Sequence, residues 1–485
     1  MNIKQFLHAR FLIFFYLICY FFILAPKLIH EPTPFYDWDE SIYVQLGRSM
    51  VTDGTFVPQW QGMNWLDKPQ LVPLFYGLVI KLTPFTTPEV STRVASLLLA
   101  IGALYLVYRL FEKVTKEPFL PLLAVIITSF TPIFLQRSQV ANTDVFVLLG
   151  WVGYLIFFQR KYLSVFFLAL AVFSKSLLGF FPIGVMGLYY TYRLITKDIK
   201  KAEYQAILKR LVIHASLFLS WYLVMLIIYG QDFWIQHIVE SHTKRVTASI
   251  ESHFGKRTYY IDLMFEQFGR YAGLSFASVV IILYQWWKKQ LDNSQLLAAL
   301  FLFPWFIFLN LTKTKIFWYS YPVIPLFAFL MIYPLSLLKR YHTLMYLAIA
   351  IIMFSFLNNQ LIEKKTHLAQ YSKPEAHHRL AIYATPRCEK MYLLVDKTTR
   401  DTLSTLESMD LLISTSRWWG SHPSMMFYFN KPIELSYDPE NFTETLKTLP
   451  KKSCAVTETL EAETTTATGF TLLKKFDTLS LYQKR

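Results

Sequence analysis

The stretch FLIFFYLICYFFILAPKLI, from Phe11 to Ile29, decides the fold class of this chain. It carries one charged residue, Lys27, and has the length of about 20 apolar residues that a helix needs to cross a bilayer. Lys4 and Arg10 precede it, as basic residues precede a secretory signal peptide. The apolar run is too long for such a peptide, however, and Ala25-Pro26-Lys27 is a poor cleavage site. We therefore interpret it as a retained first membrane helix.

The composition of the whole chain also indicates a membrane protein. Of its 485 residues, 54% are hydrophobic and only 17% are charged, and the mean hydropathy is +0.33. Soluble proteins carry more charge than this. The formal net charge of +15 would suggest a nucleic-acid partner in a soluble protein. Here many of the cations lie in short loops between apolar runs, so we expect a lipid bilayer and no nucleic acid as partner.

Further apolar runs follow the first, and together they predict about eleven transmembrane helices. The runs lie near residues 11–29, 91–108, 119–136, 143–158, 162–174, 176–192, 211–229, 271–287, 295–311, 317–338 and 343–358. Ser174-Lys175-Ser176 interrupts the pair at 162–192. Leu71–Leu82 is too short to span and contains Pro73, so we expect it to lie along the membrane surface.

The Lys and Arg residues of the short loops predict the direction of the helices. If the N-terminus is cytoplasmic, every inner segment is short and basic, with Lys4, Arg10, Arg109, Lys113, Lys116, Arg160, Lys161, Arg193, Lys197, Lys200, Lys201, Lys209, Arg210, Lys288, Lys289, Lys339 and Arg340. The outer segments hold fewer cations over a longer stretch, as the positive-inside rule requires. We therefore expect a plasma (inner) membrane protein with a cytoplasmic N-terminus and with outer loops at 30–90 and 230–270.

The last quarter of the chain has the composition of a soluble protein. Strand-like runs at Met391–Val395 and Leu411–Ser414 and an amphiphilic finish at Phe470–Tyr482 predict a small α/β domain. We expect this extracytoplasmic domain over 359–485, after a transmembrane domain over 1–358. Cys388 and Cys454 fall within it and can pair if it faces an oxidising compartment, but the sequence leaves the pairing open.

The first outer segment opens with the acidic cluster Tyr36-Asp37-Trp38-Asp39-Glu40. Acidic side chains beside a membrane are costly to desolvate unless they are paired or used. Asp39 and Glu40 can supply a general base and a second group that orients the base or holds a metal. The competing interpretation is a helix start, with Asp39 as the N-cap and Glu40 in the first turn. On the local sequence alone, a cap is the more common explanation.

Cationic and metal-ligating residues follow on the same predicted face. Lys68 suits a phosphate, and Asp67 suits a metal ion or a plain surface ion pair. The second outer segment contains Glu240, His242, Lys244, Arg245, His253, Lys256 and Arg257. Its cations run against the positive-inside rule, so an anionic ligand explains them, and Arg can hold phosphate at two points. His242 is a candidate zinc ligand, although no ligand set of recognisable spacing surrounds it and a lone His is more often a surface residue.

Two short connections add polar groups to this face. The residues are Arg137, Asn142 and Asp144 between the third and fourth spans, and Lys313, Lys315, Trp318, Tyr319 and Tyr321 between the ninth and tenth. Interfacial aromatic residues and snorkelling lysines would account for several of them without any function. Because all four clusters fall on one face, the sequence predicts an outward-facing site with acids and phosphate-binding cations.

Ordered motifs connect these clusters. They are Trp-Asp-Glu-x-x-Tyr at 38–43, Gly-Thr-Phe-Val-Pro at 54–58, Asp-Lys-Pro at 67–69, Arg93, Asp144, Ser-Lys at 174–175, Phe-Trp at 233–234, Glu240 with Arg245, and Lys-Thr-Lys with Tyr and Pro at 313–322. In this order they resemble the membrane glycosyltransferases of the dolichyl-phosphate-mannose-protein mannosyltransferase type, above all the bacterial branch that includes the aminoarabinose transferase acting on lipid A. The chain departs from that pattern at Asp67, where Glu is usual, and at Ser176, where Gly is usual.

The resemblance implies an all-α polytopic membrane fold of the GT-C type. It also implies an inverting hexosyl- or pentosyltransferase that moves a sugar from a polyprenyl-phosphate donor to a lipid, glycan or protein acceptor outside the cytoplasm. Asp39 is then the expected base, paired with Glu40, and fixed cations stabilise the leaving phosphate. The other expected site residues are Lys68, Arg245, Lys313, Lys315 and Tyr319 at the phosphate, Tyr43, Asp144 and Arg137 in the pocket, and Asp67 and His242 for a divalent metal (Zn or Mg/Mn).

Two other functions stay open from the sequence. A transporter or flippase of a lipid-linked sugar would place charged or Gly/Pro-broken positions at mid-membrane, in paired halves. Here the ionisable groups gather at one rim, and no such symmetry is visible. A catalytically dead relative that only binds polyprenyl phosphate would not need Asp39 and Lys68, which are both present. The sequence names neither the sugar nor the acceptor.

Overall fold

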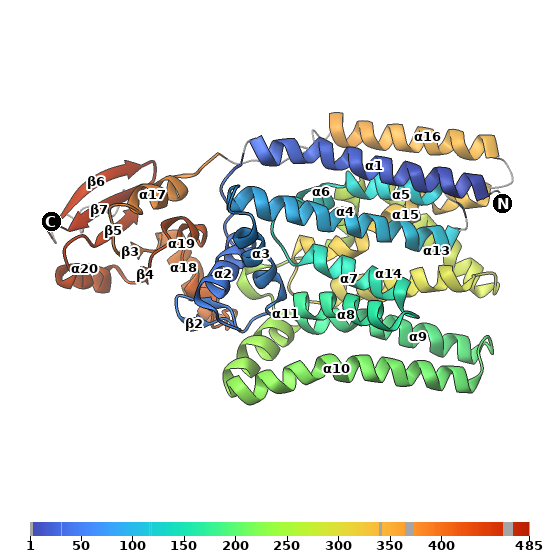
Figure 1. The fold of residues 1–485 in the computed structure, drawn as a ribbon, viewed down its shortest axis with the longest axis horizontal. Helices are drawn as coiled ribbons and strands as arrows, with labels where there is room; N and C mark the ends of the chain where they lie inside the picture. Colours follow the sequence, from blue (N-terminus) through green and yellow to red (C-terminus); the bar gives the residue numbers. More distant parts are fainter. Residues whose placement is uncertain are drawn as a thin grey trace.

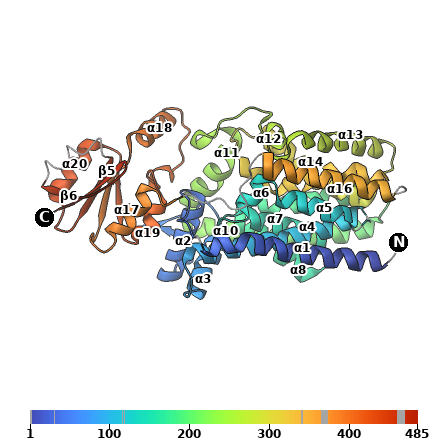
Figure 2. The same cartoon turned by 90° about the horizontal axis from the view of Figure 1, so that it is seen from above.

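A computed structural model describes residues 3–30, 32–115, 117, 119–338, 342–363, 373–458 and 469–484. The predicted inner-loop residues Lys116, Lys339 and Arg340 lie outside them. Figure 1 shows an elongated molecule with a helical bundle at one end and a smaller unit containing a sheet at the other. The short helices α2, α3 and α11 lie between these two parts (Figures 1 and 2).

Apolar helices form the bundle, and each predicted run overlaps one of them, although the runs at 119–136 and 317–338 are divided into shorter helical segments. The bundle helices are α1 (Ile3–His30), α4 (Pro88–Thr115), α5 (Phe119–Ser129), α7 (Asp144–Phe157), α8 (Lys161–Lys175), α9 (Phe181–Ile195), α10 (Lys201–Phe233), α13 (Ala272–Trp287), α14 (Asn293–Leu311), α15 (Ile324–Ile332) and α16 (His342–Asn358). Among the described residues, seven apolar segments are long enough to cross a membrane. The chain is therefore an integral membrane protein of helical type. The total of about eleven spans also needs the shorter helices α5, α7 and α13 and the division of Lys161–Ile195 into α8 and α9, and it stays a prediction.

One of those seven segments, Lys161–Ile195, contains a sharp turn. The 3-10 turn η1 (Ser176–Phe180) separates α8 from α9, and Ser176 opens it with a φ of 58°. A Cβ atom on Gly179 would lie 2.3 Å from the Cα of Val172, whereas a continuous helix rises about 10 Å over the same seven residues. The interruption in the sequence at Ser174-Lys175-Ser176 therefore marks the end of one helix and the start of another.

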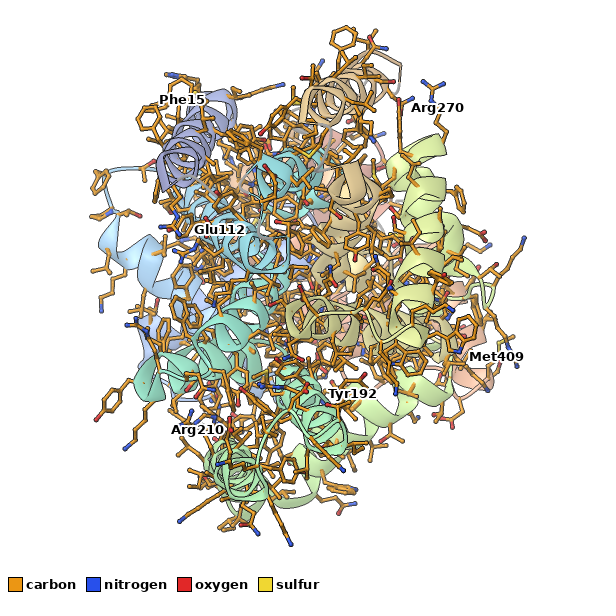
Figure 3. The ribbon with its side chains drawn as sticks, turned by 90° about the vertical axis from the view of Figure 1, so that its right-hand side faces the viewer. Phe15, Glu112, Tyr192, Arg210, Arg270 and Met409 are labelled. Atoms are coloured by element: carbon orange, nitrogen blue, oxygen red, sulfur yellow. A yellow bond between two sulfur atoms is a disulfide. The ribbon has the colours of Figure 1, made fainter. Side chains whose placement is uncertain are left out.

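The outside of the bundle is apolar in the way that a bilayer requires. Figure 3 views the bundle from the end that lies away from the sheet, with Phe15 of α1 and Arg210 of α10 at its periphery. The Phe15 side chain is 57% exposed. Glu112, in contrast, lies among the helices and forms ion pairs of 3.1 Å with Arg10 and with Arg109. Large exposed apolar surfaces of this kind mark contact with a membrane or a partner.

The remaining elements before the C-terminal unit are short. They are α2 (Asp39–Asp53), β1 (Gln59–Trp60), β2 (Met63–Asn64), α3 (Leu71–Leu82), α6 (Pro132–Arg137), the π-helix η2 (Trp234–Lys244), α11 (Arg245–Thr247), η3 (Ile250–Ser252), α12 (Tyr259–Phe268), η4 (Gly269–Tyr271), η5 (Phe317–Val323), η6 (Tyr333–Leu338) and η7 (Asn359–Glu363). In α3, the exposed side chains of Leu74, Leu78 and Leu82 recur every fourth residue. Residues at this spacing share one face of a helix, which fits the predicted position of α3 along the membrane surface.

Helices α2 and α3 cross at two glycines. A Cβ on Gly47 would lie 2.0 Å from the carbonyl oxygen of Pro73, and one on Gly77 would lie 2.1 Å from the carbonyl oxygen of Gly47. Neither position has room for a larger residue unless the backbones move apart. This crossing sets the position of the start of α2 relative to the residues that precede α3.

The C-terminal unit is an α/β structure, as predicted. Its elements are α17 (Ala376–Ala384), β3 (Met391–Leu394), α18 (Lys397–Ser408), η8 (Ser416–Trp418), α19 (Ser424–Phe429), β4 (Ile433–Ser436), α20 (Pro439–Thr448), β5 (Cys454–Glu458), β6 (Phe470–Phe476) and β7 (Leu479–Lys484). The strand order is β4-β3-β5-β7-β6, and β4, β3 and β5 are parallel, whereas β7 is antiparallel to β5 and β6. The predicted strand at Leu411–Ser414 is wrong, because this segment is a loop in which the Ser414 N–H donates to the carboxylate of Glu240.

The C-terminal unit shares a hydrophobic core with the first predicted outer segment. Trp60 packs edge-on against Trp419 at a centroid distance of 4.8 Å, and its indole N–H donates to the carbonyl of Trp418. One buried cluster contains residues of α2, α3, α17, α19 and the sheet. Cys388 and Cys454, whose pairing the sequence left open, form a disulfide that joins α17 and β5 through the loop before β3. The division at 358/359 stays a prediction, since this core crosses it.

Candidate active site

Helix α2 begins at Asp39, directly after a residue with an unusual backbone. Trp38 has φ 69° and ψ −127°, a conformation that costs a non-glycine residue about 1–3 kcal/mol. Trp38 occupies the cap position, and no side chain caps this helix, so the N-cap role considered for Asp39 is wrong. Asp39 and Glu40 still lie in the first turn, where the helix dipole favours acids. The Asp39 side chain is 33% exposed, so its carboxylate is open to an incoming molecule.

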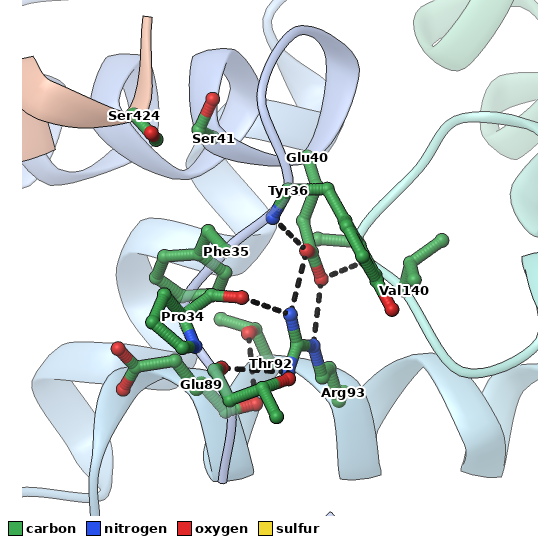
Figure 4. Close-up of polar contacts among 12 residues, drawn as sticks. Pro34, Phe35, Tyr36, Glu40, Ser41, Glu89, Thr92, Arg93, Val140 and Ser424 are labelled. Carbon is green, nitrogen blue, oxygen red and sulfur yellow. Dashed lines mark hydrogen bonds and ion pairs between the residues drawn. The ribbon is translucent and has the colours of Figure 1, made fainter. Parts of the chain in front are cut away.

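Glu40 lies beside Asp39 but points into the protein. Figure 4 shows its carboxylate facing the guanidinium of Arg93, which comes from α4. Arg93 Nε donates to one carboxylate oxygen at 2.9 Å, and Nη2 donates to the other at 2.8 Å. Both side chains are only 3% exposed. A buried two-point pair of this kind is both strong and specific in its geometry.

The remaining hydrogen bonds of this pair tie three segments together. Glu40 also accepts from the backbone N–H groups of Tyr36 (2.9 Å) and Ala141 (3.2 Å), and Arg93 also donates to the carbonyl oxygens of Thr33 and Pro34. Both oxygens of Glu40 are therefore occupied. Of the two acids expected in the catalytic pair, Glu40 is in the orienting position and Asp39 is in the accessible one.

Asp39 belongs to a chain of alternating charges. Its carboxylate lies 3.5 Å from Nη2 of Arg137, and the same nitrogen lies 2.8 Å from Asp144. Asp144, which is completely buried, also forms a 2.5 Å ion pair with Lys175 at the end of α8. Arg137 and Lys175 face the rings of Trp318 (4.9 Å) and Tyr319 (4.6 Å), respectively. The structure thus places the expected pocket residues Arg137 and Asp144 directly behind Asp39.

Lys68 and Asp67 lie in the loop before α3 and form a 3.2 Å ion pair. The Lys68 ammonium also faces the rings of Tyr43, at 5.4 Å, and Trp65, at 5.8 Å. Burial lowers the pKa of Lys68, but the negative charges of Asp67 and then of Asp39 outweigh burial and raise that pKa above its usual value. Burial likewise raises the pKa of Asp67, but Lys68 and then Arg245 overcome it and lower the pKa. Both groups are therefore charged near neutral pH.

Arg245 approaches this pair from the second predicted outer segment. It begins α11, and its guanidinium lies 3.2 Å from the carboxylate of Glu251. Its charge acts on both Asp67 and Lys68, as their pKa values show. Lys68 and Arg245 thus bring two cations to one region, although the sequence separates them by more than 170 positions.

The residues between α14 and α15 divide into two groups. Lys315 is buried, and its ammonium donates to the carbonyl oxygens of Leu309 (2.9 Å) and Asn310 (2.8 Å), so it caps the C-terminus of α14. The side chain of Lys313 is exposed, while its backbone N–H donates to the carbonyl of Val246 next to Arg245. Tyr319 contacts Lys175 through its ring. Of these three expected phosphate ligands, Lys315 instead binds the backbone carbonyls at the C-terminal end of α14.

His242 lies in the π-helix η2 and reaches the turn between α8 and α9. Its Nε2 is 2.9 Å from the hydroxyl of Ser176, which also contacts His237 Nε2 at 2.5 Å and the Tyr222 hydroxyl at 2.8 Å. His237 in turn bonds through Nδ1 to the carbonyl of Leu66, next to Asp67. Asp67 Oδ1 is buried without a hydrogen-bond partner among the described residues. Asp67 and His242, expected as metal ligands, are not part of a group of three metal-ligating residues in the described ranges.

The group of three that the described residues do contain is Asp37, His377 and His422. It lies where the start of α2 meets α17 and the loop before α19. Burial lowers the pKa of His377 to about 3, so its ring is neutral at neutral pH. Burial raises the pKa of Asp37, but its hydrogen bonds, above all the one with His422, lower that pKa overall, so this carboxylate is ionised. Asp37 belongs to the acidic cluster that stands out in the sequence, whereas no motif in the sequence indicated either histidine.

No pattern in the sequence indicated His237 as a site residue, and none showed the partners of Arg93 and Lys175. His237 lies five residues before His242, a spacing that separates two side chains on an α-helix but aligns them in a π-helix, whose hydrogen bonds run from i to i+5. Arg93 and Lys175 stood in the ordered motifs, but nothing in the sequence indicated that they pair with Glu40 and Asp144. These pairings join residues 53 and 31 positions apart, and only the folded bundle brings them together.

Comparison with known proteins places the fold. No protein-family model matches the chain, and no curated protein matches it by sequence. Among solved structures it is similar to ArnT from Cupriavidus metallidurans bound to undecaprenyl phosphate, at 14% identity and a TM-score of 0.63, and to the same protein in the apo state, at 14% identity and a TM-score of 0.65. Each of these matches covers 97% of both chains.

A third match extends the comparison. The archaeal oligosaccharyltransferase AglB from Archaeoglobus fulgidus, in complex with an inhibitory peptide and a dolichol-phosphate, matches at 12% identity with a TM-score of 0.58. This match covers 94% of the present chain and 70% of AglB. The chain therefore has the membrane-embedded fold that these transferases share, with its acids and cations gathered between the bundle and the C-terminal unit.

Proposed function

We propose that this protein is a glycosyltransferase that moves a sugar from a polyprenyl-phosphate donor to an acceptor on the non-cytoplasmic side of the membrane. The observation that carries this proposal is the exposed carboxylate of Asp39 in the same charged region as Lys68 and Arg245. A transferase of this kind needs a base near the acceptor and cations near the phosphate that leaves. The fold supports it too, because ArnT, which shares that fold, is solved with undecaprenyl phosphate bound.

In the proposed reaction, Asp39 takes the proton from an acceptor hydroxyl as that oxygen attacks the anomeric carbon of the sugar. The bond between the anomeric carbon and the phosphate oxygen breaks, and its electron pair leaves with the polyprenyl phosphate. A single displacement of this kind inverts the anomeric carbon. Arg137, 3.5 Å from Asp39, holds the base in place, and Glu40 positions it through the two-point pair with Arg93.

The leaving phosphate gains negative charge as the glycosidic bond breaks. Lys68 and Arg245 are the cations that we assign to it, because both lie on the Asp39 side of the molecule and neither caps a helix. Lys313, which is exposed and follows α14, is a third candidate. Lys315 is not included, since its ammonium is bound by two backbone carbonyls. Fixed cations in a partly dry site stabilise such a charge more than water does.

A divalent ion would suit one part of this region. Asp67 Oδ1 is buried and accepts no hydrogen bond within the described residues, so it is chemically suited to bind a cation, with His242 as the other ligand expected from the sequence. An ion held there would add positive charge beside the donor phosphate. The proposed proton transfer and phosphate binding are carried by the residues of the chain and require no such ion.

The proposed orientation follows from the distribution of Lys and Arg. The site lies at the end of the bundle that carries α2, α3 and the C-terminal unit, whereas Arg210 lies at the opposite end, in the basic segment 193–210. With the basic loops inside, the site faces the non-cytoplasmic side.

Sugar transfer in proteoliposomes tests the proposal. The purified full-length protein is reconstituted with radiolabelled polyprenyl-phosphate hexoses and pentoses, and a membrane extract supplies lipid, glycan and protein acceptors. We expect release of polyprenyl phosphate and label on one acceptor class. Movement of a lipid-linked sugar across the bilayer without any transfer would instead identify a flippase and overturn the proposal.

A further inference from the structure

Three side chains from distant parts of the sequence converge beside the start of α2. Asp37 lies in the loop before that helix, His377 is the second residue of α17, and His422 lies shortly before α19. His422 Nδ1 is 2.9 Å from Asp37 Oδ2, and His377 Nε2 is 3.3 Å from the same oxygen. One ligand atom from each residue lies within 4.8 Å of the other two.

These distances fit the coordination shell of a zinc ion. With metal–ligand bonds of about 2.0–2.1 Å in a tetrahedron, neighbouring ligand atoms lie roughly 3.3 Å apart. The observed separations from Asp37 differ from this value by less than half an ångström. The rings of His377 and His422 are parallel, with centroids 4.0 Å apart, so both present a nitrogen to the same carboxylate. Two His and one carboxylate are ligands that zinc prefers, and such a set leaves a fourth position open.

The surrounding groups orient these three ligands. Asp37 Oδ1 accepts from the backbone N–H of Ser424 at 2.9 Å, which leaves Oδ2 directed at the histidines. The carboxylate of Glu375 lies 3.6 Å from Nδ1 of His377, on the side of the ring opposite Asp37. A carboxylate on that side favours the tautomer with the proton on Nδ1 and a free lone pair on Nε2, and an acidic neighbour of this kind is common for metal-bound histidine.

A third histidine, His378, lies close by, with its Nε2 3.2 Å from Nε2 of His377, but its own hydrogen bonds go to other groups. His378 Nδ1 accepts from the backbone N–H of Glu375, so Nε2 carries the proton. Nε2 then donates to the carbonyl of Phe35 at 3.1 Å. His378 therefore supports the loop before α2 and is not a ligand.

We propose that Asp37, His377 and His422 bind one zinc ion, with the fourth position taken by water, and that this ion fastens the C-terminal unit to the start of α2. The site goes beyond the proposed transferase activity, since none of its residues belongs to the assigned base or phosphate-binding set. Asp37 precedes Asp39 by two residues, with Trp38 in its unusual conformation between them. An ion bound to Asp37 would therefore hold the segment that positions Asp39.

Metal binding to the full-length protein tests this site without any sugar donor. The protein is purified in detergent, stripped with a chelator and titrated with Zn²⁺ in competition with a chromophoric indicator. We expect one tight site per chain in the wild type and at least about 10-fold weaker binding in His377→Gln and in His422→Gln. Replacement of zinc by Co²⁺ should give the intense visible absorption of a four-coordinate site, and the same variants should lose it.

Matched variants make the result specific. His30→Gln removes an exposed histidine at the end of α1, and Asp67→Asn with His242→Gln removes the other candidate ligands, so all of these should keep the tight site. His422→Cys retains a zinc ligand and should keep it too, even if His422→Gln folds poorly. Wild-type protein that binds no zinc, or that binds it equally well after both histidine substitutions, would overturn the proposal. These measurements do not depend on sugar transfer.

Discussion

The Arg93 guanidinium binds both carboxylate oxygens of Glu40, at 2.9 and 2.8 Å, and neither side chain is more than 3% exposed. This pair connects the fourth helix of the chain to the first turn of α2. It therefore fixes the neighbouring residue, Asp39, relative to the bundle. Replacement of either residue should therefore both destabilise the fold and displace Asp39.

The variant Arg93→Met should destabilise the protein by about 3–5 kcal/mol, because it leaves the Glu40 carboxylate buried without its partner. Thermal unfolding in detergent, followed by tryptophan fluorescence, measures the change. The matched control is Arg379→Met, which breaks an exposed pair with Asp477 and should cost at most about 1 kcal/mol. Equal effects of the two substitutions would show that the Glu40–Arg93 pair does not hold the fold together.

Lys68→Gln and Arg245→Gln should each weaken the binding of undecaprenyl phosphate by about 10- to 100-fold. Each removes a charged partner worth roughly 1.5–3 kcal/mol from the assigned phosphate region. Binding of the lipid to purified protein, followed by a tritium label, gives the constants. Lys256→Gln, which changes an exposed cation in the same outer segment, should leave them unaltered. An unchanged constant in the Lys68→Gln, Arg245→Gln double variant would remove these residues from the phosphate site.

Lys315→Met should lower the unfolding temperature without changing the affinity for undecaprenyl phosphate. The substitution removes a buried ammonium that binds two carbonyl oxygens at the end of α14. Charged hydrogen bonds of this kind contribute about 1.5–3 kcal/mol each. The same lipid-binding and fluorescence measurements separate the two effects, and a selective loss of lipid affinity would return Lys315 to the phosphate site.

Gly47→Ala should disrupt the crossing of α2 and α3, because the new methyl group would meet the carbonyl of Pro73. We expect a destabilisation of about 1–3 kcal/mol, because α2 and α3 must move apart. We also expect a loss of sugar transfer, because α2 carries Asp39 and α3 directly follows the loop that carries Lys68. Gly184→Ala in α9 is the control. Its new Cβ meets nothing within 4 Å, so unfolding should stay unchanged or shift upward slightly. Normal activity in Gly47→Ala would mean that this contact is not required.

The redox state of Cys388 and Cys454 tests on which side of the membrane the C-terminal unit lies. The disulfide between them closes a segment of 66 residues, which corresponds to roughly 4 kcal/mol in a chain-entropy model. If the C-terminal unit is outside the cytoplasm, neither cysteine in protein from native membranes should react with maleimide before reduction. Cys19, which is not part of a disulfide, is the internal reference once the membranes are dissolved in SDS and its thiol in α1 is exposed to water. Free thiols at 388 and 454 in membranes that preserve the native redox state would contradict the orientation.

Much of the bundle could be predicted from the sequence, because the length of an apolar run is a direct consequence of bilayer thickness. Each predicted run has a helix, and Ser174-Lys175-Ser176 does separate the two runs at 162–192. The predicted position of the loops at one rim of the bundle also indicated which residues lie together: Asp39, Lys68, Arg137, Asp144 and Arg245. Lys315 shares that rim but caps a helix, and no local signal distinguishes a capping lysine from a phosphate-binding one.

The pairings within the site could not be predicted in the same way. Glu40 and Asp39 are adjacent acids, and only the position of Arg93 on α4 decides which of them is buried. His237 and His242 share a face because η2 is a π-helix, a form that the sequence does not indicate. Asp37 meets His377 and His422 across more than 330 residues, because the C-terminal unit folds back onto the first outer segment.

The rate of sugar transfer by Asp39→Asn tests the central claim most directly. The change keeps the size of the side chain and removes its basicity, so single-turnover transfer at saturating donor should fall by about 10²- to 10⁴-fold while donor affinity stays near the wild-type value. Asp53→Asn, at the exposed end of the same helix, should transfer at the wild-type rate. Transfer by Asp39→Asn at the rate of Asp53→Asn would contradict the assignment of Asp39 as the base.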